Sequence, residues 1–469
     1  MNPPRELRCS QEPTTYDDGP SYRLAIGTET NDSSSRRALI KGRVARYGDG
    51  QATRGTDGGP VRPLRVVLIE FTSSGGLFHF AFQLGEALAS SGHRVKLITG
   101  RGPEFLPRVP GFDVLPILPT WHPSTSTTLP PLLHKARRVL RALRYIDAWR
   151  RVVAYLRRNC VDAAMWSIWR FPIDGWFFTW LAWRARGTVW AVVAHEPRPF
   201  DEQRGEGSLY TSEWSFRFLR RALGDAYQRL DTVFVLGDKT RRELLDLWPQ
   251  VRRVEVIPHG DERIFAQFAV RPPEACPARV LFFGTWTRYK GLDFLLEAFD
   301  VLRARMPEAE LVVAGAVTKG VDVSVLRQRG HEIGGVDLRP GYVPVREVGR
   351  LFGQSRVVAI PYLRGAQSGV VHLAQTFGRP VVATAVGDIP AAVGHGTTGL
   401  VVPPEDVAGF ASALERLLRD PLEASRMGRA ARERVEGESS WEVVAARVAK
   451  VLQELVEGKQ GQAVQRSRS

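Results

Sequence analysis

Residues 65–99, RVVLIEFTSSGGLFHFAFQLGEALASSGHRVKLIT, carry the pattern that decides the fold. The run 65–70 is apolar and β-branched up to Glu70, as expected for a strand buried on both faces of a parallel sheet. Apolar residues then recur at helical spacing over 77–90, Gly92-His93 ends that pattern, and 94–99 is predicted to form a second strand. This order predicts a βαβ unit, and therefore an α/β protein built on a parallel sheet.

The alternation of strands and helices continues along the chain in two series. A Pro-rich stretch, 271–277, separates them and is predicted to be a linker. We therefore predict two Rossmann-like domains facing a central cleft, with ligands bound at the carboxyl ends of the strands. Further strands are predicted at 189–194, 232–236, 254–258, 279–283, 310–314, 357–361 and 380–384. The predicted boundaries are 1–60 for a disordered tail, 61–265 and 275–440 for the two domains, 441–458 for a terminal helix and 459–469 for a polar tail.

The composition is sufficient for two hydrophobic cores, and the net charge favours an anionic partner. The chain has 469 residues, 43% of them hydrophobic, and a net charge of +15. Nucleic acid, anionic lipid and sugar phosphates are all partners for such a charge. The sequence contains no nucleic-acid recognition motif, so we do not expect nucleic acid among its partners.

The cysteines and the apolar stretches indicate the cellular compartment of the protein. Cys9, Cys160 and Cys276 lie far apart without CxxC spacing, which argues against a disulfide framework and against a structural zinc site. The first residues lack the apolar core of a signal peptide, and the most apolar stretch, 176–183, is far shorter than the ~20 residues that span a bilayer. We expect a cytoplasmic protein.

Three loops that follow predicted strands carry candidate ligand-binding residues. Gly75-Gly76 would let a helix N-terminus approach an anion, although a glycine pair is equally common in a plain turn. Arg288 and Lys290 would suit a pyrophosphate leaving group, the alternative being solvated loop charges. The segment 361–370 leads from a strand into a helix, with Ser368 as its expected N-cap.

The order of these motifs resembles that of a family 4 glycosyltransferase of the GT-B fold over about residues 64–450. The matching blocks are FTSSGGLFHFAFQLGEALASSGHRVKLIT, VIPHG, FFGTWTRYKGLDFLLEAF, GYVP, IPYLRGAQSGV, FGRPVVATAVGDIP and GTTGLVVPPED. The resemblance implies that the second domain binds a nucleotide-sugar and the first an acceptor, and that the terminal helix packs back toward the first domain.

The resemblance also implies roles for individual residues. Lys290 would hold the pyrophosphate together with Arg288, and His195 would contact the donor sugar near the reacting carbon. Taken without the resemblance, a histidine after an apolar strand is more often structural. The residues expected to bind the donor are Gly75, Gly76, Gly284, Thr285, Val343, Gln367, Ser368, Gly369 and Val370.

The chain also departs from the widespread family pattern. Thr285 stands where an arginine is usual, and Gly365 and Leu373 stand where two glutamates are usual. The QSGV wording is similar to that of a subgroup that lacks the glutamates. We therefore expect an active hexosyltransferase, the alternative being a degenerate partner that binds a nucleotide-sugar without transferring it.

The implied mechanism is a retaining transfer from a UDP- or GDP-sugar that needs no metal or other cofactor. The departing phosphate itself would take the acceptor proton, and Lys290 and Arg288 would stabilise the diphosphate. The sequence contains no compact cluster of metal-ligand spacing, in agreement with this expectation.

An epimerase of the same architecture would need carboxylates and histidines that the matching blocks lack. The implied context is polysaccharide or cell-envelope biosynthesis.

The segment 134–159 concentrates positive charge. It contains one lysine and eight arginines against the single acid Asp147, and its apolar residues fall near one helical stripe. A basic amphipathic helix of this kind suits a peripheral enzyme on the inner face of an anionic membrane with a lipid-linked acceptor. The alternative is a helix that faces the core and exposes a solvated arginine face.

Overall fold

The computed structural model describes residues 62–119, 131–169, 171, 173–184, 187–195, 213–266, 270–318, 320–365 and 367–468. The predicted disordered tail, 1–60, lies outside these residues. The described chain from Pro63 onward belongs to one compact unit. Its strands form two separate parallel sheets, which confirms the predicted fold class.

The first sheet has seven strands in the order β3-β2-β1-β4-β5-β6-β7. The predicted βαβ unit is present, since β1 and β2 pair in parallel with Val66 opposite Val95, and α2 connects them. Three other strands are the predicted ones, whereas β3 and β4 were not predicted. The strands are β1 (Arg65–Ile69), β2 (Arg94–Gly100), β3 (Phe112–Leu118), β4 (Ala163–Trp166), β5 (Val189–Ala194), β6 (Thr232–Val235) and β7 (Val254–Val256).

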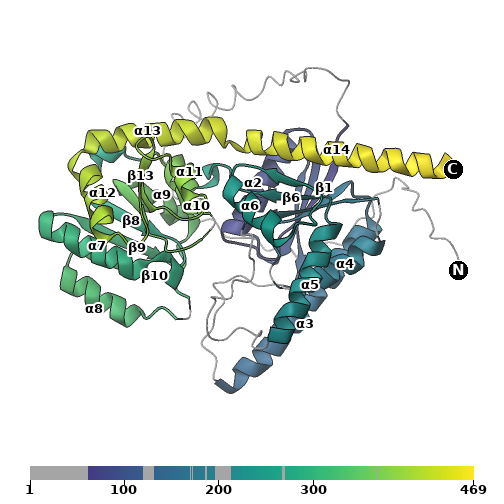
Figure 1. The fold of residues 1–469 in the computed structure, drawn as a ribbon, viewed down its shortest axis with the longest axis horizontal. Coiled ribbons are helices and arrows are strands. Elements are labelled where there is room, and N and C mark those ends of the chain that lie inside the picture. Colours follow the sequence, from purple (N-terminus) through teal and green to yellow (C-terminus); the bar gives the residue numbers. More distant parts are fainter. Residues whose placement is uncertain are drawn as a thin grey trace, which may run out of the picture. The chain divides into compact units, whose positions relative to one another are not determined.

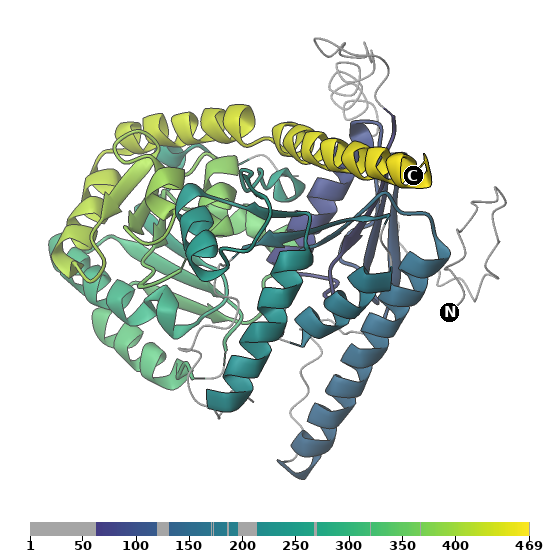
Figure 2. The same ribbon diagram turned by 45° about the vertical axis from the view of Figure 1, so that its right-hand side comes forward.

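Helices cover both faces of the first sheet because its strands are apolar on both sides. Leu68 belongs to the cluster packed under α2 and α14, and the adjacent Val67 belongs to the cluster under α3, α4 and α5. Figure 2 shows α14 on one side of this sheet and α3 with α5 on the other. The helices are α2 (Gly76–Ser90), α3 (Pro131–Arg158), α4 (Asp174–Arg184), α5 (Glu213–Arg229) and α6 (Asp238–Leu247).

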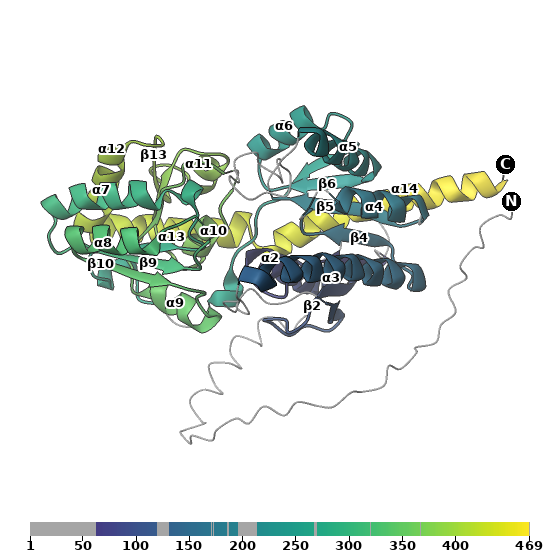
Figure 3. The same cartoon turned by 90° about the horizontal axis from the view of Figure 1, so that it is seen from below.

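The second sheet has six strands in the order β10-β9-β8-β11-β12-β13. Figure 3 shows α7 and α12 on one side of it and α9 on the other. The strands are β8 (Arg279–Phe283), β9 (Glu310–Gly315), β10 (Val336–Pro340), β11 (Val357–Ile360), β12 (Val381–Thr384) and β13 (Gly399–Val402). The helices are α7 (Leu292–Arg305), α8 (Val323–Ile333), α9 (Val345–Gly353), α10 (Gly369–Thr376), α11 (Ile389–Val393), α12 (Val407–Arg419) and α13 (Pro421–Glu438).

The terminal helix α14 (Trp441–Arg468) returns to the first sheet, as the resemblance implied (Figure 1). Its Trp441 Nε1 donates to the carbonyl of Asp261 at 2.6 Å, and the Trp441 ring lies 5.1 Å from Phe80 of α2. The helix does not end at 458 as predicted. Lys459 Nζ contacts Asp231 at 2.6 Å and the carbonyl of Thr188 at 2.7 Å, which ties this turn to the first domain.

Two other sequence-based expectations can be compared with the structure. Cys276 is a buried free thiol and Cys160 is disulfide-bonded, whereas the cysteine spacing argued only against a disulfide framework. Among the helices that the structure describes, none is both long enough and apolar enough to span a bilayer.

Candidate active site

Lys290 lies in a short 3-10 turn, Arg288–Lys290, between β8 and α7. Gly291 ends this turn in a left-handed conformation (φ 67°), directly against the carbonyl of Pro361. The Lys290 ammonium lies over the ring of Tyr362, 5.2 Å from its centroid. Burial opposes the charge, but the hydroxyls of Tyr362 and Tyr289 outweigh burial and hold the pKa of Lys290 above its ordinary value.

The Lys290 ammonium is close to two other predicted donor residues. A Cβ built on Gly284 would lie 3.1 Å from Lys290 Nζ and 3.7 Å from Val370 Cγ2. Gly284 itself has φ 116°, a conformation that favours glycine. No carboxylate in the described chain forms an ion pair with Lys290. The structure therefore brings Gly284, Lys290 and Val370 together, and the Lys290 ammonium has no anionic partner in the part of the chain that is described.

The start of α10 faces the same region. Ser368 occupies the predicted N-cap position, but its hydroxyl bonds Tyr362 Oη at 3.2 Å and makes no capping hydrogen bond, which corrects its expected role. The first backbone N–H groups of a helix have no partner within it, so they are available to an anion. Gln367 Nε2 donates to the carbonyl of Leu236 in the first domain, and Gln367 Oε1 is buried without a hydrogen-bond partner in the described chain.

His195 follows β5, as predicted. Its ring packs edge-on against Phe80 at 4.9 Å, and its Nε2 is buried without a hydrogen-bond partner among the described residues. Burial, helped by nearby His259, lowers the pKa of His195 to about 3. The imidazole is therefore neutral at physiological pH and offers one donor and one acceptor to a ligand.

Two further histidines were missed by the sequence-based assignment of site residues. His259, from the VIPHG block, stacks on His372 of α10 at 4.7 Å with the rings 7° from parallel. Burial lowers the pKa of His259 to about 4 and lowers that of His372 as well. His259 Nε2 lies 3.2 Å from the position of a Cβ on Gly369. The only sequence signals were the HG dipeptide after a strand and a histidine shortly after QSGV.

Gly75 and Gly76 begin α2 at the carboxyl end of β1. Gly75 has φ 85°, and a Cβ on either glycine would meet nothing within 4 Å, so the space before this helix is open. The hydroxyls of Ser73 and Ser74 are buried beside them without hydrogen-bond partners in the described residues. This loop therefore offers unsatisfied polar groups beneath an open helix N-terminus.

Glu104 was also missed. Its Oε2 lies 2.7 Å from His79 Nε2 of α2, and its Oε1 accepts from the hydroxyl of Tyr342 in the GYVP block. Burial opposes the charge, but the bonds from His79 and Tyr342 hold the pKa of Glu104 below its ordinary value. This carboxylate joins the first domain to the loop of Val343. Val343 is partly buried against the larger core cluster.

Two other predicted residues lie at the surface. The two positions where glutamates are usual hold a buried leucine and a glycine with positive φ. Thr285 is exposed, and Arg288 is exposed with its Nε donating to the carbonyl of Gly320 at 3.2 Å. Leu373 is 5% exposed and belongs to the core, so this chain buries an apolar side chain where a carboxylate is usual. Gly365 has φ 130°, which favours glycine. No group of His, Cys, Asp or Glu in the described chain is arranged to hold a metal ion.

Two domains, each built on a parallel sheet, are the architecture of the GT-B fold. The family model described as "Glycosyl transferase 4-like domain" matches residues 75–260, and "Glycosyl transferases group 1" matches 277–420. The chain belongs to the group 1 glycosyltransferases, as the sequence motifs predicted.

Three similar proteins illustrate this relationship. Glycogen synthase of Mycobacterium tuberculosis is 29% identical over 47% of this chain and 53% of its own length. GDP-mannose-dependent alpha-(1-6)-phosphatidylinositol monomannoside mannosyltransferase of the same species is 29% identical over 56% of this chain and 75% of its own. Sucrose-phosphate synthase of Thermosynechococcus elongatus shares the fold, with a TM-score of 0.61 and 21% identity over 84% of this chain and 99% of its own. The match to glycogen synthase thus spans about half the length of that relative.

Proposed function

We propose that this chain is a retaining glycosyltransferase that moves a sugar from a UDP- or GDP-sugar to an acceptor on the first domain, without a bound metal. The observation that carries the proposal is the Lys290 ammonium, which lies beside Gly284 and Val370 and has no carboxylate partner among the described residues. A leaving diphosphate bound there would supply the missing anion. The alternative of a degenerate binder has no support from the similar proteins, whose names are those of enzymes.

In the proposed mechanism, Lys290 and the first N–H groups of α10 neutralise charge as the bond to the diphosphate breaks. The neutral imidazole of His195 orients a donor hydroxyl by hydrogen bonding. It does not act as a general acid, because its pKa of about 3 leaves the acidic imidazolium form unpopulated at neutral pH. The departing phosphate oxygen takes the acceptor proton, and the acceptor oxygen bonds to the sugar on the same face. The diphosphate leaves, with the proton it has taken, as part of the released UDP or GDP.

A thermal-shift panel of nucleotide-sugars tests the donor assignment. A ligand that binds only the folded state stabilises it by about 2.7 kcal/mol at a hundredfold excess over Kd. We expect one nucleotide-sugar to raise the melting temperature of the wild type. In Lys290→Ala the shift should largely disappear, while Arg327→Ala, an exposed cation of α8, should keep it. The assignment fails if no nucleotide-sugar shifts the wild type.

We further propose that the enzyme works on the cytoplasmic face of an anionic membrane, through residues 134–159, on a lipid-linked acceptor. Val153 and Leu156 of α3 are buried, as a core-facing helix requires. In the preceding turns, however, Val139, Leu140 and Leu143 are 60%, 47% and 59% exposed. Exposed apolar residues on an arginine-rich helix favour membrane contact over a purely solvated face. The mannosyltransferase named above acts on a phosphatidylinositol mannoside, which fits such an acceptor.

Liposome binding tests this second proposal. The purified protein should co-sediment with vesicles that contain an anionic phospholipid, should bind neutral vesicles much less, and should be released by salt. If the protein fails to bind anionic vesicles at low salt, the membrane proposal is wrong and the donor assignment is unaffected.

A further inference from the structure

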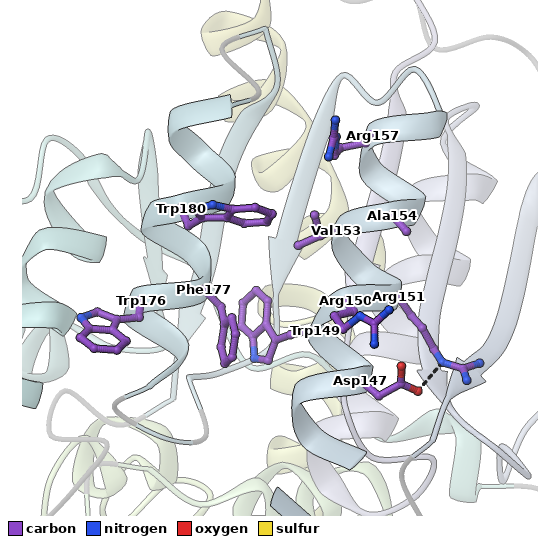
Figure 4. Close-up of a pocket in the computed structure, with 10 residues that line it drawn as sticks. All are labelled: Asp147, Trp149, Arg150, Arg151, Val153, Ala154, Arg157, Trp176, Phe177 and Trp180. Carbon is purple, nitrogen blue, oxygen red and sulfur yellow. Dashed lines mark hydrogen bonds and ion pairs between the residues drawn. The ribbon is translucent and has the colours of Figure 1, made fainter. Parts of the chain in front are cut away.

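A groove of about 720 Å³ separates α3 from α4 on the first domain, as Figure 4 shows. One face of α3 supplies arginines and small apolar residues, and α4 supplies three aromatic residues. This volume falls within the range of small-molecule sites. The lining residues are Asp147, Trp149, Arg150, Arg151, Val153, Ala154, Arg157, Trp176, Phe177 and Trp180.

The groove is held in shape by a buried carboxylate beneath it. Asp174, at the start of α4, accepts from Trp149 Nε1 at 2.9 Å and from Tyr145 Oη at 2.5 Å. Phe177 stacks on Trp149, with ring centroids 5.4 Å apart and planes 20° from parallel. Because these contacts join the two helices, the aromatic floor between them is preformed.

Two large aromatic side chains of the groove are exposed to solvent, although large apolar side chains are usually buried. Trp176 is 55% exposed and Trp180 is 45% exposed. Tryptophan is enriched where an apolar phase meets water, because its ring is apolar and its N–H is polar. The groove also lies on the helix whose earlier residues Val139, Leu140 and Leu143 are exposed, so the apolar surface extends along α3.

The charges of the groove are unbalanced. Asp147 is its single acid, and Arg151 Nε already pairs with that carboxylate at 2.8 Å. Arg150 and Arg157 are exposed, and neither forms an ion pair within the described chain. Guanidinium groups bind phosphate oxygens in a bidentate geometry, so a phosphate ligand would balance these charges.

We propose that this groove binds one phosphate-bearing lipid of the membrane, with the phosphate on Arg150 and Arg157 and the first acyl carbons on Trp176 and Trp180. The proposal rests on the membrane contact proposed above and gives it a specific site. A free phosphate would satisfy the arginines but leave the tryptophans in water. A lipid with a neutral head group would cover the tryptophans but leave the arginines without an anion.

Arg157 and Arg158 provide a matched test. They are adjacent and exposed on the same helix, but only Arg157 lines the groove. Binding to vesicles with and without phosphatidylglycerol should be measured for Arg157→Gln and Arg158→Gln. We expect Arg157→Gln to weaken binding about fivefold or more, and Arg158→Gln to weaken it less. Equal losses would mean a diffuse basic surface and would overturn the groove proposal.

Trp180→Ala tests the apolar half of the site, with Leu422→Ala, another exposed apolar residue, as its control. Only Trp180→Ala should weaken vesicle binding, and unchanged binding would contradict the proposal. Inorganic phosphate should compete poorly at matched ionic strength, since full competition would indicate a small-anion site. Each variant should keep the donor-induced thermal shift of the wild type, which separates failure of this site from failure of the fold or of the donor assignment.

Discussion

The carboxylate of Asp388, in the second domain, lies 2.6 Å from Thr240 Oγ1 of α6, in the first. It also accepts from the backbone N–H groups of Lys239 and Thr240 at 2.9 and 3.0 Å. Gly237, the N-cap residue of α6, has no side chain of its own, and a Cβ there would lie 2.3 Å from Asp388 Cγ. One domain therefore caps a helix of the other.

Asp388→Ala should destabilise the protein by about 1–3 kcal/mol, because it leaves the Thr240 N–H, which is buried, and the Lys239 N–H, which is partly buried, unpaired at a helix N-terminus. Hydrogen exchange at the Lys239 and Thr240 amides should accelerate with it. Asp322→Ala removes the cap of α8 inside the second domain and is the control. It should cost stability without changing exchange in α6, and a similar exchange rate in both variants would count against the interdomain cap.

The buried histidines predict loss of stability in mild acid. The folded-state pKa values of His195 and His259, about 3 and about 4, lie below the ordinary value of 6.5. The unfolded chain therefore binds more protons between these values, so stability falls as pH drops from about 6.5 toward 4.

We expect a loss of about 1–2 kcal/mol for each histidine between pH 7 and pH 5. His372→Leu keeps an apolar side chain against the His259 ring but removes one buried base, so its acid-induced loss of stability should be smaller. His331→Gln, on the exposed surface of α8, should behave as the wild type. An acid-induced loss of stability between pH 7 and pH 5 that is as large in His372→Leu as in the wild type would refute this prediction.

Glu262 predicts the opposite slope between about pH 4.5 and pH 8. Burial, helped by Asp261 and opposed by a 3.0 Å hydrogen bond from Gln83 Nε2, raises the pKa of Glu262 to about 8. The folded state thus holds a proton that the unfolded state releases above about pH 4.5, and stability is lost as pH rises from there toward 8.

Glu262→Gln mimics the protonated carboxyl and should stabilise the protein at pH 8 by about 1–3 kcal/mol, with little effect at pH 5. Urea unfolding at both pH values measures the difference. The result would be contradicted if the substitution destabilised the protein equally at pH 5 and pH 8, because the carboxylate would then be the favoured form.

Local sequence patterns predicted most of the fold. The strands β1, β5 and β8 were predicted because their apolar runs are nearly continuous, and burial on both faces leaves this clear signal. The strand β4 was missed because Ala-Ala-Met-Trp is short and not β-branched. The strands β3 and β10 alternate or contain proline, since they lie at sheet edges.

The candidate site was predicted only where a loop follows a strand directly. The positions of Lys290, His195 and Gln367 could be assigned in this way. Glu104, His259, His372 and Asp388 act through partners far away in the sequence, such as Tyr342 or Thr240. No local pattern reports such contacts, and they became visible only when the structure brought the segments together.

Release of nucleoside diphosphate from the donor with the largest thermal shift tests the central claim most directly. The wild type should release UDP or GDP in the presence of acceptor, and Lys290→Ala should release it about 10²–10³-fold more slowly, as for loss of one electrostatic group at a reacting centre. Arg288→Ala should lose less, since its side chain is exposed and bonded to Gly320, and Arg327→Ala should match the wild type. Equal rates in the wild type and Lys290→Ala, or no release by the wild type despite donor binding, would contradict the account.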